Sequence, residues 1–99
     1  MYTAMARVTL RIPLSVSLKD KRQVLRSVLA KLRNQFEVAA AEVAAQDVRN
    51  LAVLGLACVS GDGAHAQAVL ERAVRFLEET RPDVEITAVE TDVATLEDV

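Results

Sequence analysis

The sequence predicts an α+β domain in which two helices cover one face of a four-stranded sheet, and three observations lead to this prediction. Residues 6–14 and 84–89 alternate apolar and polar side chains, as half-buried strands do. Residues 18–34 and 63–80 repeat apolar side chains every three or four positions, as amphipathic helices do. Two more runs of strand length lie between these helices, so the predicted order of elements is βαββαβ.

The first strand leads into a helix whose start carries a capping pattern. Residues 6–14 place alternate apolar side chains on one face, and Pro13 lies near the end, where a missing N–H is tolerated. Ser17 is a good N-cap, and Asp20 stands where its carboxylate can reach back to the cap. The apolar stripe of the helix consists of Leu25, Val28, Leu29, Leu32 and Phe36.

The two middle strands differ in how clearly the sequence marks them. The alanines of residues 36–44, "FEVAAAEVA", also favour a helix, so a strand and a helix are both compatible with that segment. Residues 46–50, "QDVRN", form a polar turn. Residues 51–60, "LAVLGLACVS", are a continuous apolar run, which predicts a strand that is buried on both faces.

The second helix follows the chain break at residues 61–63, "GDG". Asp62 can cap it, and Arg81 and Pro82 end it. Right-handed helical crossovers place both helices on the same face of the sheet. The sequence therefore predicts a ferredoxin-like two-layer sandwich with an antiparallel sheet in the order 4-1-3-2.

Composition indicates a single globular domain that spans residues 1–99. One cysteine allows no internal disulfide, and together with one histidine it leaves too few ligands for the usual zinc sites, so we expect no metal and no cofactor. No apolar run is long enough to span a membrane, and the N-terminus lacks the pattern of a signal peptide. We expect a soluble, cytoplasmic protein.

Charge is divided unevenly along the chain. Residues 1–36 carry a net charge of +7, whereas residues 37–99 carry −9. At 100° per residue, four cations of the first helix fall on one side of it and form what we call the basic stripe: Lys19, Arg22, Arg26 and Arg33. No acid stands at helical spacing to pair with them, so the stripe costs helix stability through repulsion.

The basic stripe has two interpretations. Exposed cations and free N–H groups at a helix start suit phosphate, and the later arginines would extend the contact along a nucleic-acid backbone. Alternatively, the stripe is a solvated face whose long stems shield the edge of the core.

Lys21 differs from the stripe because it falls on the apolar side of the helix. We expect it either to extend its ammonium to solvent, to pair with an acid such as Asp47, or to join the anion site. Cys58 is predicted to be a small buried apolar residue and His65 an exposed residue of the first helical turn. Asp47 is a turn residue or a functional acid.

The face of the sheet that carries no helix is expected to be apolar and poor in aromatics. Neither predicted central strand contains an aromatic residue on which a base could stack. An uncovered apolar face is an interaction surface, which predicts self-association, most simply as a dimer.

Several stretches resemble one family of small bacterial proteins. They are "SLKDKRQVLRSVLAKLRNQF", then "AAEV" with Glu42, a loop acid at Asp47, and "LGLACVSGD". Together they resemble the YlxP-like family, a domain of unknown function. One position departs from the pattern, because Arg49 stands where that family often has tryptophan.

The resemblance implies a ferredoxin-like fold and a bacterial cytoplasmic protein. Genes of that family often lie among those for translation initiation and ribosome maturation factors, which implies a role near ribosomal RNA. The family has no established enzymatic activity, so the resemblance supplies no catalytic residues.

Three functions remain open from the sequence. The first is an accessory protein that binds ribosomal RNA or the ribosome through Lys19, Arg22, Arg26, Arg33 and Lys21. The second is a self-associating structural or regulatory module with a protein partner. The third is a small-ligand binder or enzyme that uses Lys21, Glu42 and Asp47, although no nucleophile with a base, and no acid–base pair, stands at a recognisable spacing.

Overall fold

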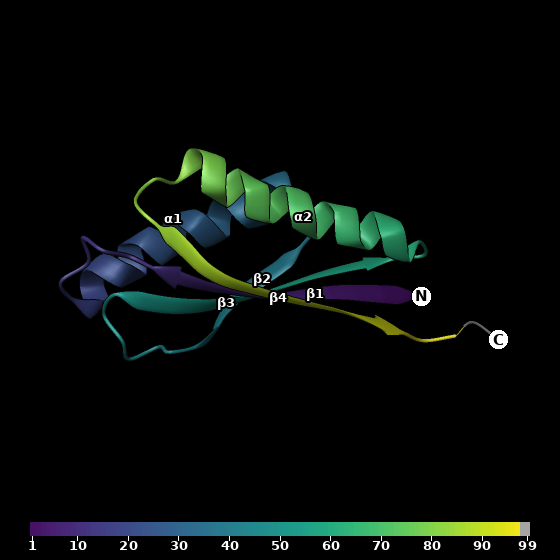
Figure 1. Ribbon diagram of the computed structural model, residues 1–99, viewed down its shortest axis with the longest axis horizontal. Coiled ribbons are helices and arrows are strands. Elements are labelled where there is room, and N and C mark those ends of the chain that lie inside the picture. The colour runs from purple at the N-terminus through teal and green to yellow at the C-terminus, as the bar shows by residue number, and fades with distance from the viewer. Residues whose placement is uncertain (98–99) are drawn as a thin grey trace.

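The computed structural model describes residues 1–97 and has the predicted order of elements. The strands are β1 (Tyr2–Arg11), β2 (Ala39–Ala44), β3 (Leu51–Ser60) and β4 (Glu85–Thr95), and the helices are α1 (Leu18–Gln35) and α2 (Gly63–Thr80). All strand pairs are antiparallel in the order β2-β3-β1-β4, which is the predicted order read from the other edge. Figure 1 shows both helices on the same side of the sheet, as right-handed crossovers require.

The core lies between the helices and the even-numbered side of the two central strands. In β1 and β3 the residues that face the helices are almost fully buried, because successive side chains of a strand point to opposite faces. α2 packs over these central strands, whereas α1 packs over β2. The buried residues of α1 are Lys21, Leu25, Val28 and Leu32, and those of α2 are Ala66, Val69, Leu70, Ala73 and Leu77.

Two predictions about the middle strands have different outcomes. The alanine-rich segment is a strand over Ala39–Ala44, so the helical alternative for it is wrong. Burial of β3 on both faces is also wrong within the single chain. Its odd-numbered residues are only partly buried and Val59 is 63% exposed, because no element within residues 1–97 covers that face.

Irregularities occur in both edge strands. β2 has a bulge at Val43, between the pairs Glu42–Leu54 and Ala44–Val53. The Val43 side chain lies over Gly55, where an added Cβ would come within 2.8 Å of Val43 Cγ1. Glycine at position 55 therefore gives this bulge room on the open face. β4 shifts its register against β1 between Thr9 and Leu10.

Helix ends follow the predicted caps. The Ser17 hydroxyl accepts a hydrogen bond from Asp20 N (3.1 Å), and Asp62 Oδ1 accepts from Ala64 N (3.0 Å) and His65 N (3.4 Å). Each cap satisfies N–H groups that have no partner inside the helix. No helix in the part of the chain that the structure describes is long and apolar enough to cross a membrane.

Candidate nucleic-acid interface

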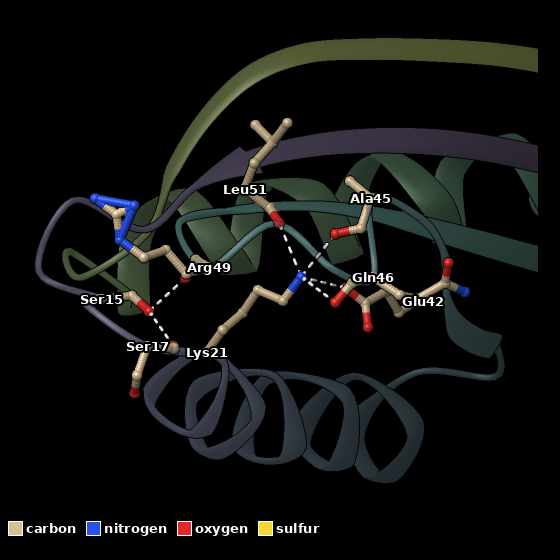
Figure 2. A network of polar contacts seen from close by, with 8 residues as sticks. All are labelled: Ser15, Ser17, Lys21, Glu42, Ala45, Gln46, Arg49 and Leu51. Atoms are coloured by element: carbon tan, nitrogen blue, oxygen red, sulfur yellow. Dashed lines mark hydrogen bonds and ion pairs between the residues drawn. The ribbon is translucent and has the colours of Figure 1, made fainter.

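Lys21 lies at the centre of a polar network that joins α1 to the β2–β3 connection (Figure 2). Its side chain is almost fully buried, and Nζ donates hydrogen bonds to the carbonyl oxygens of Ala45 (2.8 Å), Gln46 (3.1 Å) and Leu51 (3.1 Å). Since an ammonium has three protons, these carbonyls use all of its donors. The first of them belongs to the residue Ala45, whose φ of 59° lies in the left-handed region.

Glu42 balances the charge of the buried Lys21 ammonium. Glu42 Oε2 lies 3.0 Å from Lys21 Nζ but has no hydrogen bond, because the three protons point to carbonyls. The attraction is therefore mainly Coulombic, across a site where the two side chains are 1% and 20% exposed. Lys21 thus pairs with Glu42, and the expected pairing with Asp47 is wrong. Lys21 also does not extend to solvent.

This arrangement bears on two roles that the sequence left open. The Lys21 ammonium faces inward and its donors are occupied, so it lies apart from the exposed cations of α1. Asp47 is exposed in the connection and is not drawn into the Lys21–Glu42 pair. A ligand site made of Lys21, Glu42 and Asp47 therefore has no support from the geometry. The two described surface hollows are lined by other residues.

Serine side chains fix the segment that precedes α1. The buried Ser15 hydroxyl lies 2.5 Å from Arg49 O and 3.1 Å from Ser17 O, and so bridges this segment to the β2–β3 connection. Asp20 reaches back past the cap, since its Oδ2 accepts from Val16 N at 3.1 Å. These hydrogen bonds fix the start of α1 against the β2–β3 connection.

The basic stripe lies on a solvent-exposed flank of α1, beside the buried face of the helix. Lys19, Arg22 and Arg26 are exposed, and among the described residues none of them forms an ion pair within 4 Å. Arg33 is also exposed, but its Nε and Nη2 donate to Ala40 O on the edge strand β2, at 3.0 and 2.5 Å. The structure therefore brings the four cations together on one side of α1, with Arg33 anchored to the sheet.

Arg49, in the β2–β3 connection, was not singled out from the sequence as a site residue. The hydrogen bond from Ser15 to the Arg49 carbonyl ties the Arg49 backbone to the segment before α1, whereas its exposed side chain points away from α1 (Figure 2). The sequence had drawn attention to Arg49 only as a departure from the YlxP-like pattern, which often has tryptophan at this position.

An ion pair after the end of α2 contacts the other flank of α1 and stabilises the fold. Arg81, at the C-cap of α2, binds the carboxylate of Asp83 through two nitrogens (2.9 and 2.8 Å) and Ser27 Oγ of α1 through Nη1 (2.8 Å). The hydrogen bonds from Arg81 hold the pKa of Asp83 below its usual value. These contacts connect the two helices and leave the basic stripe untouched.

Cys58 and His65 have the environments that the sequence predicts. Cys58 is 2% exposed, and burial raises the pKa of its thiol, so it is an inert part of the core. His65 is exposed in the first turn of α2. Residues 1–97 contain no group of three or more side chains that could hold a metal ion.

Comparisons with known proteins place the chain in a family. Residues 3–91 match a family model described as "Protein of unknown function (DUF503)". The chain belongs to the DUF503 family. "Uncharacterized protein YlxP" of Bacillus subtilis (strain 168) is 33% identical over 76 residues, which cover 77% of this chain and 82% of that protein.

These comparisons give the chain a family and name no activity. The "SLKDKR" block that carried the resemblance divides into two sets of residues. Ser17, Asp20 and Lys21 are used inside the fold, as a cap, a reach-back carboxylate and a buried ammonium. Lys19 and Arg22 remain exposed and without an ion-pair partner among residues 1–97.

Proposed function

We propose that the protein is an RNA-binding accessory protein of the ribosome, which holds phosphate backbone along the basic stripe. The observation that carries the proposal is the exposure of Lys19, Arg22 and Arg26 on one side of α1, without carboxylate partners among the described residues. Surface cations that nothing neutralises repel one another and cost stability, so a benefit from an anionic partner accounts for them.

The geometry supports backbone contact and not the reading of bases. Three cations spaced along successive turns of a helix match a row of phosphates, and they release counterions when they bind it. The open sheet face, by contrast, presents Met5, Val53 and Val59 and no aromatic ring from its central strands. Stacking of bases on the sheet, as in the common RNA-binding sheets, is therefore not part of the proposal.

The test compares two variants of equal net charge. Lys19→Gln/Arg22→Gln/Arg26→Gln removes three cations of the stripe, and Lys31→Gln/Arg72→Gln/Arg75→Gln removes three exposed cations elsewhere. Affinity for a fluorescein-labelled RNA stem-loop is measured by anisotropy between about 50 and 200 mM salt, the range in which counterion release changes affinity steeply. Co-sedimentation with purified ribosomal subunits follows the same variants.

We expect the stripe variant alone to lose affinity and ribosome binding. The slope of log affinity against log salt should fall by roughly two to three units, because each lost phosphate contact removes about 0.7–0.9. Its thermal stability should match or slightly exceed that of the original protein, since repulsion and unfavourable charge at the helix start are relieved. Equal effects of the two variants on binding would show a response to net charge alone and would overturn the proposal.

A second candidate function is self-association through the open sheet face. The observation that favours it is the apolar surface of Met5 (39% exposed), Val43 (52%) and Val59 (63%) on neighbouring strands. A second copy that packs face to face would cover it. Sedimentation equilibrium should then show a dimer that Val59→Lys dissociates, whereas a monomer at all concentrations would exclude this function.

A further inference from the structure

β4 is a long edge strand with free hydrogen-bonding groups. It pairs with β1 on one side only, over its 11 residues. Met1 and Leu96 exchange both main-chain hydrogen bonds, so alternation along the antiparallel ladder makes Met5–Asp92 and Arg7–Glu90 bonded pairs too. The N–H and C=O groups of Val89 and Thr91 therefore point away from β1, and their side chains face the helices.

The other edge of the sheet is protected, which distinguishes it from β4. β2 has six residues, a bulge at Val43, and the Arg33 guanidinium on the Ala40 carbonyl. Short length, bulges and inserted charges are the usual devices that prevent pairing at an edge. β4 has one irregularity, near its start, where its register against β1 shifts between Thr9 and Leu10. Beyond that point, the one comparable contact to an outward group among residues 1–97 is that of Asp92 Oδ1, which accepts from Val93 N at 2.8 Å.

An apolar groove lies beside this free edge, on the helix side of the sheet. It arises because α2 packs over β1 and β3 and leaves β4 largely uncovered. The groove measures about 370 Å³, and its apolar lining comes from both layers. Val89 is 43% exposed there, although Val8, its partner across the ladder, is fully buried. The apolar lining residues are Ala6, Leu70, Val74 and Val89.

The acidic residues on β4 favour a neighbouring strand that carries cations. Glu85, Glu90 and Asp92 face the open side of β4, and no lysine or arginine occurs after Arg81. Arg7 already pairs with Glu90 through Nη2 at 2.7 Å, so a cation on the next strand would continue a row of alternating charge. A second copy of β4 would instead bring acid against acid, which is unfavourable.

We propose that β4 accepts an extended segment of another protein in which apolar residues alternate with lysine or arginine. The segment adds a fifth strand to the sheet and bonds to the outward main-chain groups of Val89 and Thr91. Its apolar side chains enter the groove between α2 and β4, and its cations lie beside Glu85, Glu90 and Asp92. Main-chain bonds give affinity in such strand addition, and the alternate side chains give specificity.

The probe is a fluorescein-labelled nine-residue peptide in which lysine and valine alternate. A peptide of the same composition with lysines and valines in blocks tests the alternation, and one with glutamate in place of lysine tests the charge. Binding is measured by anisotropy on the full chain. Amide signals of the 15N-labelled protein locate the contact, and we expect those of Val89 and Thr91 to shift most. We expect both control peptides to bind at least about tenfold more weakly than the alternating probe.

Two protein variants test the edge itself. Thr91→Pro removes an outward N–H but no bond to β1, so the fold should persist while probe affinity falls at least about tenfold. Thr91→Val keeps the N–H and should bind normally. In case the proline variant does not fold, Val89→Lys places a cation in the groove and should also prevent binding, whereas Val59→Lys on β3 should not.

Three results would overturn the proposal. The first is equal affinity for the alternating and block peptides, and the second is a set of shifted amides centred on α1 or β2. The third is a dimer that Val89→Lys separates and Val59→Lys does not, because the free edge would then belong to a second copy of this chain.

Discussion

At the scale of single residues, the buried ammonium of Lys21 accounts for the most specific part of the sequence motif. Burial of a charge is costly unless it is paired and hydrogen-bonded, and here three carbonyls and the Glu42 carboxylate meet both conditions. The sequence already showed that Lys21 is unusual, because on a helical wheel it falls on the apolar side of α1. Its partners could not be predicted, because main-chain carbonyls brought together by a left-handed residue leave no pattern in the sequence.

The first prediction is that Lys21→Met strongly destabilises the protein. It leaves three carbonyls without their donor and Glu42 without its counter-charge, and breaking a buried pair in this way costs about 3–5 kcal/mol. Urea unfolding measures the loss. Lys31→Met, an exposed lysine of the same helix, should change stability by less than about 0.5 kcal/mol. Similar midpoints for the two variants would show that the Lys21 network contributes little.

At the scale of elements, the sequence was most informative where periodicity and caps agreed. α1 was expected over residues 18–34 and spans Leu18–Gln35, because Ser17 and the apolar stripe mark both ends. β3 was identified correctly but its burial was not. Its small odd-numbered residues, such as Gly55 and Ala57, look like core residues in sequence yet lie on the uncovered face. The apolar run of β3 alone predicted burial on both faces, although the crossover rule already predicted that one face of the sheet carries no helix.

The second prediction concerns the connection between β2 and β3. Ala45 has a φ of 59°, and a residue with a Cβ pays about 1–2 kcal/mol there. Glycine avoids this cost but loses about 0.5–1 kcal/mol of chain entropy, so Ala45→Gly should leave stability unchanged or raise it by up to about 1.5 kcal/mol. Thermal melting checks the sign.

Ala41→Gly is the matched control for that substitution. Ala41 lies in the extended strand β2, where glycine brings only the entropic loss of about 0.5–1 kcal/mol. The two changes should therefore act in opposite directions or differ clearly in size. Equal destabilisation by both would mean that the left-handed conformation at residue 45 carries no cost that glycine relieves.

At the scale of the whole molecule, the two edges of the sheet differ in charge. The basic stripe follows α1 above β2, and the acids of β4 lie at the opposite edge. Three spacings of about 4.8 Å separate β2 from β4, or roughly 14 Å. That exceeds the screening length of about 8 Å at physiological salt, so partners at the two edges should have little electrostatic influence on each other.

The third prediction follows from this separation and joins the two proposals. Lys19→Gln/Arg22→Gln/Arg26→Gln should weaken RNA binding and leave affinity for the alternating lysine–valine peptide within about twofold at 0.15 M salt. Thr91→Pro, which changes no charge, should lose the peptide and retain RNA binding with an unchanged salt slope. Both variants are titrated with each probe separately, since a basic peptide would bind RNA directly. If either variant weakens both interactions, the two partners share one surface, and the division of this sheet into an RNA edge and a peptide edge is wrong.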